Sequence, residues 1–144
     1  MSAFADSSAL VKLYVDEDDS DAVLYFSALA VSCVARVEVP AALWRKHRLG
    51  ELDATTTRVF LDNFEADFFG DELMPSRFSV LGLSEDVLDE AARLVAVHPL
   101  RAYDALQLAS ALAARAADPD CTGFACFDSA LRTAATVEGL AVVP

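Results

Sequence analysis

The sequence contains no long apolar run. None of its apolar stretches approaches the roughly 18 residues that a membrane-spanning helix needs, although 55% of its 144 residues are hydrophobic. Residues 1–4 also lack the basic region and the cleavage pattern of a secretory signal. We therefore expect a cytoplasmic protein with a well-supplied hydrophobic core.

Several motifs that define common enzyme classes are also missing. There is no glycine-rich phosphate loop, no Gly-x-Ser-x-Gly nucleophile motif and no paired cysteine motif. The three cysteines, Cys33, Cys121 and Cys126, have spacings that suit neither a disulfide framework nor a zinc site, so we expect buried free thiols. His47 lies in a basic cluster and His98 near an expected helix end, so neither indicates a catalytic histidine.

Basic residues are scarce. The chain has 11 Lys and Arg against 23 Asp and Glu, which gives a net charge of -12. Such a charge repels nucleic acid at long range and favours cationic partners or metal ions. Five of the acids fall within residues 16–21, and the main basic cluster, residues 45–48, is short. Composition alone therefore argues against a nucleic-acid-binding protein.

Short apolar runs alternate with segments of helical periodicity along the chain. This alternation is typical of parallel strands joined by right-handed helical crossovers. We therefore predict a single domain over residues 1–144 with an α/β fold, a three-layer α/β/α sandwich around a mainly parallel sheet. The expected strands cover residues 2–5, 30–34, 78–81, 123–127 and 140–143. The expected helices cover residues 7–15, 36–49, 55–69, 100–117 and 129–137. A further helix is expected to begin at Ser84. Another is expected after the acidic run, and its apolar side would consist of Val23, Leu24, Phe26 and Leu29.

Two similar segments, FADSSAL at residues 4–10 and CFDSAL at residues 126–131, each pass from an apolar run through an aspartate into a helical pattern. Each predicts a strand-to-helix junction that places a carboxylate, Asp6 or Asp128, at the carboxyl end of a strand. In an open parallel sheet this end forms the ligand crevice. Taken singly, each aspartate is also explained as a helix N-cap.

Glu38 and Asp104 are two further candidates. Glu38 is surrounded by apolar residues, and burying its charge without a partner would cost several kcal/mol. The alternative is a surface glutamate near a helix start, since Pro40 suits a first turn. Asp104 lies three residues from Arg101, so an ordinary surface pair between the two is an equally simple explanation.

Together these four acids suggest one site. Carboxylates that converge in a crevice repel one another, so they must share protons or bind a cation. Hard oxygen ligands without cysteine or histidine nearby suit Mg²⁺ or Mn²⁺. Such an ion promotes phosphodiester hydrolysis, because it polarises a phosphate oxygen and lowers the pKa of bound water.

Three phenylalanines, Phe60, Phe64 and Phe68, recur every fourth residue along one expected helix, with Phe69 adjacent. A stripe of this kind usually faces the core. The alternative is a groove that receives an amphipathic segment of a partner protein. The sequence leaves both interpretations open.

Four segments together resemble the PIN-domain ribonucleases, specifically the VapC toxins of bacterial toxin–antitoxin pairs. They are FADSSALVKLY at residues 4–14, RVEVPAAL at residues 36–43, RAYDALQLA at residues 101–109 and FDSAL at residues 127–131. Each segment is weakly specific alone, but their order, their spacing and the total length match the family. The resemblance therefore covers the whole chain.

The resemblance implies a Mg²⁺- or Mn²⁺-dependent endoribonuclease that cuts tRNA, rRNA or mRNA. It also implies a homodimer that a VapB antitoxin neutralises. The small hydroxyl residue of the family falls on Ser7, which we expect to help position the substrate together with Arg101. The acidic quartet of the family, expected to be both catalytic and metal-binding, falls on Asp6, Glu38, Asp104 and Asp128.

Two positions depart from the family pattern. Many relatives carry serine or threonine where this chain has Cys126, and histidine where it has Gln107. Both departures leave the carboxylates intact, so they bear on substrate positioning more than on metal binding. Arg45, Lys46 and Arg48, with Arg101, could line a path for the RNA backbone, and such contacts would weaken steeply with salt.

Two other functional classes compete with this interpretation. A receiver-like binding domain also collects acids at strand ends, but it would need a lysine at a late strand end, and Lys12 and Lys46 are elsewhere. A phosphatase with Asp6 as covalent nucleophile would usually need a second aspartate two residues on, where this chain has Ser8.

Overall fold

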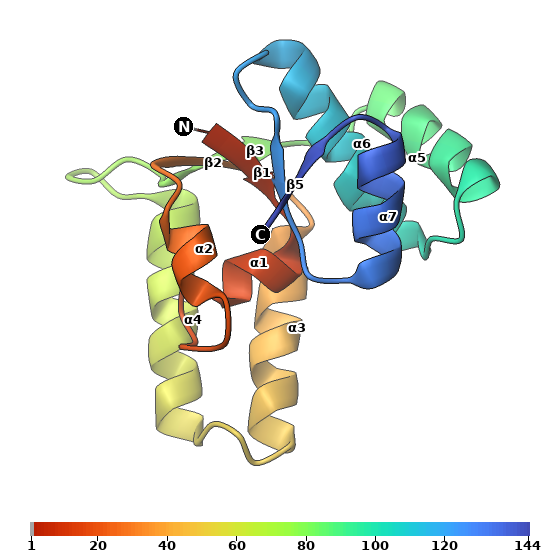
Figure 1. The fold of residues 1–144 in the computed structure, drawn as a ribbon. Helices are drawn as coiled ribbons and strands as arrows, with labels where there is room; N and C mark the ends of the chain where they lie inside the picture. The colour runs from red at the N-terminus through yellow and green to blue at the C-terminus, as the bar shows by residue number, and fades with distance from the viewer. Residues whose placement is uncertain (1) are drawn as a thin grey trace.

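Figure 1 shows the computed structural model of the protein, which describes residues 2–144. Five parallel strands form one sheet in the order β3-β2-β1-β4-β5. No helix within these residues is both long and apolar enough to cross a membrane. The strands are β1 (Ser2–Ala5), β2 (Ala28–Ser32), β3 (Phe78–Leu81), β4 (Gly123–Ala125) and β5 (Ala141–Val143). The helices are α1 (Ser7–Val11), α2 (Ser20–Leu24), α3 (Ala35–Arg48), α4 (Ala54–Phe69), α5 (Glu85–Val97), α6 (Ala102–Ala117) and α7 (Ser129–Val137).

The sheet separates two hydrophobic cores, because successive side chains of a strand point to opposite faces. On β1, Ala3 and Ala5 belong to the core that includes α1, α3 and α4, whereas Phe4 belongs to the core formed with α5, α6 and α7. Phe4 meets Phe124 of β4 edge to face, with ring centroids 5.7 Å apart. The predicted α/β/α sandwich with a parallel central sheet is therefore confirmed.

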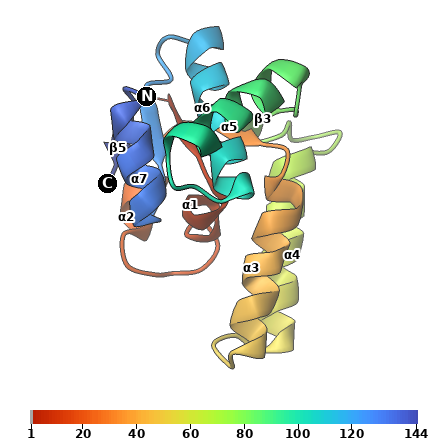
Figure 2. The same ribbon diagram turned by 90° about the vertical axis from the view of Figure 1, so that its right-hand side faces the viewer.

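Helices α3 and α4 lie side by side and extend well beyond the sheet, as Figures 1 and 2 both show. A short turn joins them, in which Gly50 adopts a φ of +78° that side chains other than glycine rarely accept. Asp53 then begins α4 as its N-cap, with Oδ1 accepting a hydrogen bond from Thr56 N at 2.7 Å. The pair forms an arm that carries its own charged surface away from the sheet.

The N-terminal part of the chain differs most from the prediction. Helix α1 ends at Val11 rather than at residue 15, because the backbone N–H groups of residues 12–14 donate to carbonyls three residues back and form a tighter turn. Strand β2 begins at Ala28 rather than at residue 30, so Leu29 belongs to this strand and not to the preceding helix. An apolar run of this length fits either structure by periodicity, and its pairing with β1 decides the outcome.

The later elements agree with the prediction to within two residues. Strand β3 and helix α7 have the predicted bounds. Strand β4 ends at Ala125 rather than at residue 127, so Cys126 and Phe127 separate the strand from the aspartate that follows. Cys121 and Cys126 are buried free thiols as predicted, whereas Cys33 is half-buried.

The phenylalanine stripe of α4 faces the core. Phe64 is fully buried and contacts Tyr14 edge to face, with ring centroids 5.9 Å apart. Phe60 and Phe68 are half-buried against the same core, and Phe69 is 60% exposed. Phe64 therefore cannot form part of a groove for a partner segment, and among these four rings only that of Phe69 is largely exposed.

Candidate active site

The candidate site lies at the carboxyl ends of β1 and β4. Asp6 follows β1 directly and begins α1, where its Oδ1 accepts a hydrogen bond from Ala9 N at 2.9 Å. Asp128 follows β4 and begins α7, with Oδ1 accepting from Leu131 N at 2.9 Å. Asp6 N donates to Ala125 O at 3.0 Å, which joins the two strand ends. Both aspartates are N-caps, and capping itself places their carboxylates at the same edge of the sheet.

Asp6 is almost completely buried, with 5% of its surface exposed. The pKa of its carboxyl is raised to about 7, chiefly because burial disfavours the charged form. Hydrogen bonds from Ser8 Oγ, at 2.6 Å, and from Ala9 N lower this pKa, whereas the nearby Glu38 and Asp104 raise it. A buried acid among other acids is the environment that a bound cation would relieve.

Glu38, in the first turn of α3, is held by side chains from two other helices. Ser7 Oγ of α1 donates to Glu38 Oε1 at 3.1 Å, and Gln107 Nε2 of α6 donates to the same oxygen at 2.7 Å. Gln107 Nε2 also donates to Ser7 Oγ at 3.1 Å. Burial raises the pKa of Glu38, the bonds from Gln107 and Ser7 lower it, and Asp104 raises it. Glu38 is therefore a half-buried, oriented carboxylate and not a free surface residue.

Gln107 is a functional candidate that sequence reasoning recognised only as a departure from the family pattern. Its side chain is 2% exposed. A carboxylate only accepts hydrogen bonds, so the amide nitrogen must face Glu38, and the carbonyl oxygen Oε1 is left without a partner among residues 2–144. Such a buried, unpaired oxygen costs about 1–3 kcal/mol. The available sequence signal is a polar residue between Leu106 and Leu108 in the largely apolar α6.

Asp104, in the first turn of α6, is half-buried. Burial raises the pKa of its carboxyl, Asp128 raises it as well, and Arg101 lowers it. Arg101 is the exposed residue that precedes α6. Between residues 2 and 144, no group donates a hydrogen bond to the Asp104 carboxylate, and Arg101 forms no direct ion pair with it. The surface ion pair between these two side chains, which was the alternative explanation of Asp104, is therefore not formed.

The four predicted acids lie near one another at this edge of the sheet. The charges of Glu38 and Asp104 raise the pKa of Asp6, and the charge of Asp128 raises the pKa of Asp104. They come from the ends of two strands and from the first turns of α3 and α6. Over residues 2–144, no three acidic, histidine or cysteine side chains approach closely enough to hold an ion by themselves. The arrangement is an open cluster of carboxylates.

The donor atoms of this cluster fit a hard cation. The two histidines are engaged elsewhere, His98 with Glu138 and His47 with a backbone carbonyl. Burial raises the pKa of Cys126 to about 12, and Asp6 contributes, so this thiol stays protonated. Carboxylate oxygens suit Mg²⁺ or Mn²⁺, and Mg²⁺ commonly takes only one or two carboxylates together with water. The open spacing of the acids agrees with that preference.

The chain matches a known protein family over most of its length. The model of the PIN domain matches residues 3–135. The chain belongs to the PIN domain family. No match was found among curated proteins. The resemblance inferred from the four sequence segments is thus confirmed at the level of the PIN family.

The PIN domain of this chain is also similar to several solved structures. PAE2754 from Pyrobaculum aerophilum is 24% identical, with a TM-score of 0.62 over 99% of this chain and 83% of that chain. A toxin-antitoxin complex from Klebsiella pneumoniae is 19% identical, with a TM-score of 0.57 over 88% and 87%. VapC20 from Mycobacterium tuberculosis, named as a sarcin-ricin loop cleaving toxin, is 14% identical, with a TM-score of 0.60 over 96% and 95%. At these identities the likeness concerns the fold.

Proposed function

We propose that this PIN domain is a metal-dependent endoribonuclease that acts as the toxin of a toxin–antitoxin pair. The observation that carries the proposal is the burial of Asp6 beside Glu38 and Asp104, which raises its pKa to about 7. Carboxylates that raise one another's pKa are stabilised together by a cation. Membership of the PIN family and the likeness to the fold of VapC20, a toxin named for RNA cleavage, support RNA as the substrate.

Asp6 and Asp104 are the best candidates for holding Mg²⁺ or Mn²⁺ directly. Among residues 2–144, the hydrogen bonds to the Asp6 carboxylate all go to Oδ1, and the Asp104 carboxylate accepts none. Glu38 and Asp128 would complete the shell, directly or through water. When bound, the ion would polarise a phosphate oxygen of the RNA and lower the pKa of bound water.

The other polar side chains would orient the reacting groups. Ser7 and Gln107 fix Oε1 of Glu38, which leaves Oε2 to accept a proton from the attacking water. Ser7 therefore acts on the substrate through Glu38. In this proposal Arg101 would bind a phosphate of the RNA, which its effect of lowering the pKa of Asp104 supports.

We also propose a VapB-like antitoxin as the protein partner and a homodimer as the assembly. The likeness to a toxin-antitoxin complex supports the first partner. The net charge of -12 would favour association with a basic antitoxin. In this proposal the chain works as a single PIN domain over residues 1–144, and its RNA target places it in the cytoplasm.

A binding domain with an acidic pocket but no hydrolysis has less support. A receiver-like pocket needs a lysine after a late strand, whereas β4 and β5 are followed by Cys126 and Pro144. A phosphatase would need an aspartate at the position of Ser8, whose hydroxyl instead donates to Asp6. The nuclease proposal accounts for all four acids.

RNA cleavage by three forms of the protein tests the proposal: wild type, Asp104→Asn and Asp89→Asn. Asp89 is exposed on α5, so its replacement makes the same charge change away from the site. Wild type and Asp89→Asn should cleave total RNA when Mg²⁺ or Mn²⁺ is added and stop when EDTA removes it. Asp104→Asn should be slower by more than about 100-fold, since even residues that only support metal ligands contribute about 10- to 100-fold.

The thermal midpoint supplies a readout that does not depend on activity. A cation that binds only the folded form stabilises it by about 2.7 kcal/mol at a hundredfold excess over its dissociation constant. Mn²⁺ should therefore raise the midpoint of wild type and Asp89→Asn but not that of Asp104→Asn. Cleavage at the wild-type rate by Asp104→Asn in Mg²⁺ would contradict the proposed site.

A further inference from the structure

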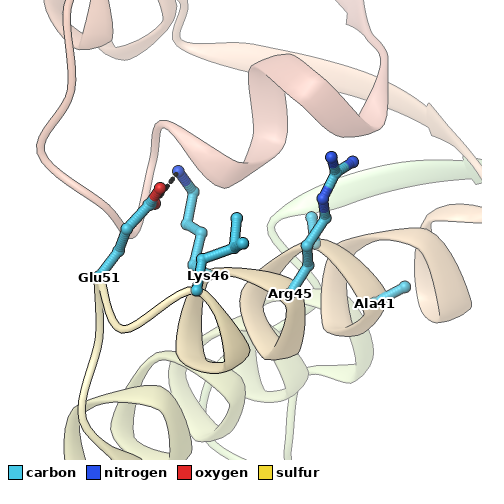
Figure 3. Close-up of a pocket in the computed structure, with 6 residues that line it drawn as sticks. Ala41, Arg45, Lys46 and Glu51 are labelled. Carbon is cyan, nitrogen blue, oxygen red and sulfur yellow. Dashed lines mark hydrogen bonds and ion pairs between the residues drawn. The ribbon is translucent and has the colours of Figure 1, made fainter.

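Two lysines meet a single glutamate in the region between α1 and α3. Lys12 Nζ pairs with Glu17 Oε2 at 3.4 Å, and Lys46 Nζ of α3 pairs with the other carboxylate oxygen, Oε1. The three side chains are between 12% and 25% exposed. Lys12 also donates to Asp18 O at 2.6 Å. Lys46 also pairs with Glu51 at 3.4 Å, and a dashed line in Figure 3 marks this pair. Both ammonium groups are thus partly covered and directed at the same anion.

The first of these lysines contacts the residue that precedes one of the four acids. Lys12 Nζ is 4.4 Å from the centroid of the Phe127 ring. Phe127 immediately precedes Asp128, one of the four clustered acids. A cation and an aromatic ring therefore meet at the residue before Asp128.

A groove follows one side of α3 and reaches the second lysine. Its hollow has a volume of about 510 Å³ and is lined by Ala41, Ala42, Arg45, Lys46, Leu49 and Glu51. Glu38, Ala42, Arg45 and Leu49 are three or four residues apart, so they follow one side of the helix. Figure 3 shows Arg45 and Lys46 projecting from α3 on the side of this hollow. The groove therefore begins about one turn beyond Glu38 and has cations along its wall.

We propose that Lys12 and Lys46 bind backbone phosphates of single-stranded RNA that runs from the acidic site along α3, and that Glu17 occupies their phosphate position in the RNA-free protein. This inference rests on the proposed ribonuclease function. Lysine binds phosphate as a point charge. Single-stranded nucleic acid is bound by cation-lined grooves with aromatic rings on which bases stack. Phe127 supplies an aromatic ring, Lys12 and Lys46 supply the cations, and the hollow along α3 supplies the groove.

Glu17 is an anion that RNA must displace. Partial burial by itself would raise its pKa, but Lys46 and Lys12 hold the pKa of Glu17 below its usual value. The carboxylate is therefore charged at neutral pH and competes with phosphate for both lysines. In a protein with a net charge of -12, this competition adds to the repulsion that RNA already meets. Removing the charge of Glu17 should consequently strengthen RNA binding, whereas a purely structural ion pair would leave it unchanged.

The first test compares Glu17→Gln with Asp19→Asn. Both substitutions remove one negative charge from the same loop, but the Asp19 side chain has no ion pair among residues 2–144, and asparagine tolerates the left-handed backbone found there, with φ of 67°. Binding of a labelled single-stranded RNA oligonucleotide is measured by fluorescence anisotropy with the full chain, in EDTA to prevent cleavage. Glu17→Gln should tighten binding about threefold to tenfold, and Asp19→Asn by less than about twofold.

The second test removes the cations. Lys12→Gln and Lys46→Gln should each weaken RNA binding and reduce the slope of log affinity against log salt by about 0.7 for each lost phosphate contact. In the double variant Glu17→Gln with Lys12→Gln, the gain from Glu17→Gln should shrink, because the glutamate acts through the lysine. A thermal midpoint for each variant shows that the compared proteins are folded.

The outcomes separate this inference from the function on which it rests. If wild type neither binds nor cleaves RNA, the ribonuclease proposal fails and this inference fails with it. If wild type binds and cleaves RNA but Glu17→Gln binds no more tightly than Asp19→Asn, only this inference is wrong. A lower thermal midpoint together with unchanged RNA affinity would make the Lys12–Glu17–Lys46 cluster a structural contact.

Discussion

Gln107 connects three segments that are far apart in the sequence. Its amide nitrogen, on α6, reaches both Ser7 of α1 and Glu38 of α3. The carboxylate is thereby held from two sides, while the unpaired carbonyl of Gln107 remains buried. The geometry assigns this residue the task of positioning Glu38, and it does so at a cost to stability.

Replacing Gln107 should therefore separate metal binding from stability. In Gln107→Leu, Glu38 loses its shorter hydrogen bond, so we expect Mn²⁺ affinity and RNA cleavage to fall about 10- to 100-fold. The unfolding midpoint should change little, because the substitution also removes an unpaired buried oxygen. Calorimetric titration with Mn²⁺ and thermal unfolding measure the two effects.

Gln107→His provides the matched control. Histidine offers a ring N–H that can donate to Glu38, so this variant should recover much of the Mn²⁺ affinity. Wild-type affinity in Gln107→Leu would contradict the positioning role. Equal losses in both variants would indicate that only the shape of glutamine is tolerated.

The four acids were predictable at the scale of residues, but their contacts were not. Asp6 and Asp128 follow apolar runs and precede helical patterns, which is a local signal. The hydrogen bond from Gln107 to Glu38 joins residues 69 positions apart, and it depends on how α3 and α6 approach each other. No spacing in the sequence encodes that approach, because local periodicity predicts elements and not the contacts between them.

At the scale of elements, α4 shows how one helix divides its apolar residues between core and surface. Phe64 lies at the centre of its buried face, while Phe69, at the end of the helix, is 60% exposed. The Phe69 ring is 5.1 Å from the guanidinium carbon of Arg36 on α3. Phenylalanine therefore packs in the core at position 64 and contacts an arginine at the surface five residues later.

Alanine substitutions on α4 should reveal this division. Phe64→Ala should lower the free energy of unfolding by roughly 3–5 kcal/mol, because it leaves a cavity in the core. Phe69→Ala should lower it by less than about 1 kcal/mol, since most of that ring is already in water. Urea denaturation of the two variants measures the difference, and similar losses would mean that the stripe is not packed as described.

The type of most strands and helices, and their succession along the chain, followed from the sequence. Their apolar periodicities are distinct, and turn residues such as Gly50 and Pro99 separate several of them. The exceptions lie around the acidic run. Leu29 fits the apolar side of a helix as well as a strand, and only its pairing with Ala3 of β1 assigns it to the sheet. Tertiary pairing outweighs local preference at such positions.

At the scale of the whole molecule, charge and exposed apolar surface both favour association with other proteins. The chain keeps a net charge of -12, yet several large apolar side chains lie at its surface. Val37 is 72% exposed and Tyr25 is 70% exposed. Burying some of this exposed apolar surface against a second chain would favour association.

Light scattering at micromolar concentration should return the mass of a homodimer, twice the 15.4 kDa of the chain. Closed two-fold dimers are the commonest soluble assembly, and they bury apolar surface without leaving an open end. Asp104→Asn, which alters the acidic site alone, should give the same mass. A mass of 15.4 kDa for both proteins would remove the homodimer from the proposal.

The arm formed by α3 and α4 is packed unequally along its length, since the buried residues of α3 end at Leu43. Near the sheet, α3 is anchored by buried Val39 and by the contacts of Glu38, whereas the far turns of both helices are covered mainly by each other (Figure 2). Regions with few buried contacts open locally at low free energy, well before the whole domain unfolds. Local opening should therefore begin at the turn between α3 and α4 and reach the carboxylates last, and the Lys46–Glu17 pair ties the far part of α3 to the rest of the domain. The geometry of the acidic site is thereby separated from fluctuations at the tip of the arm.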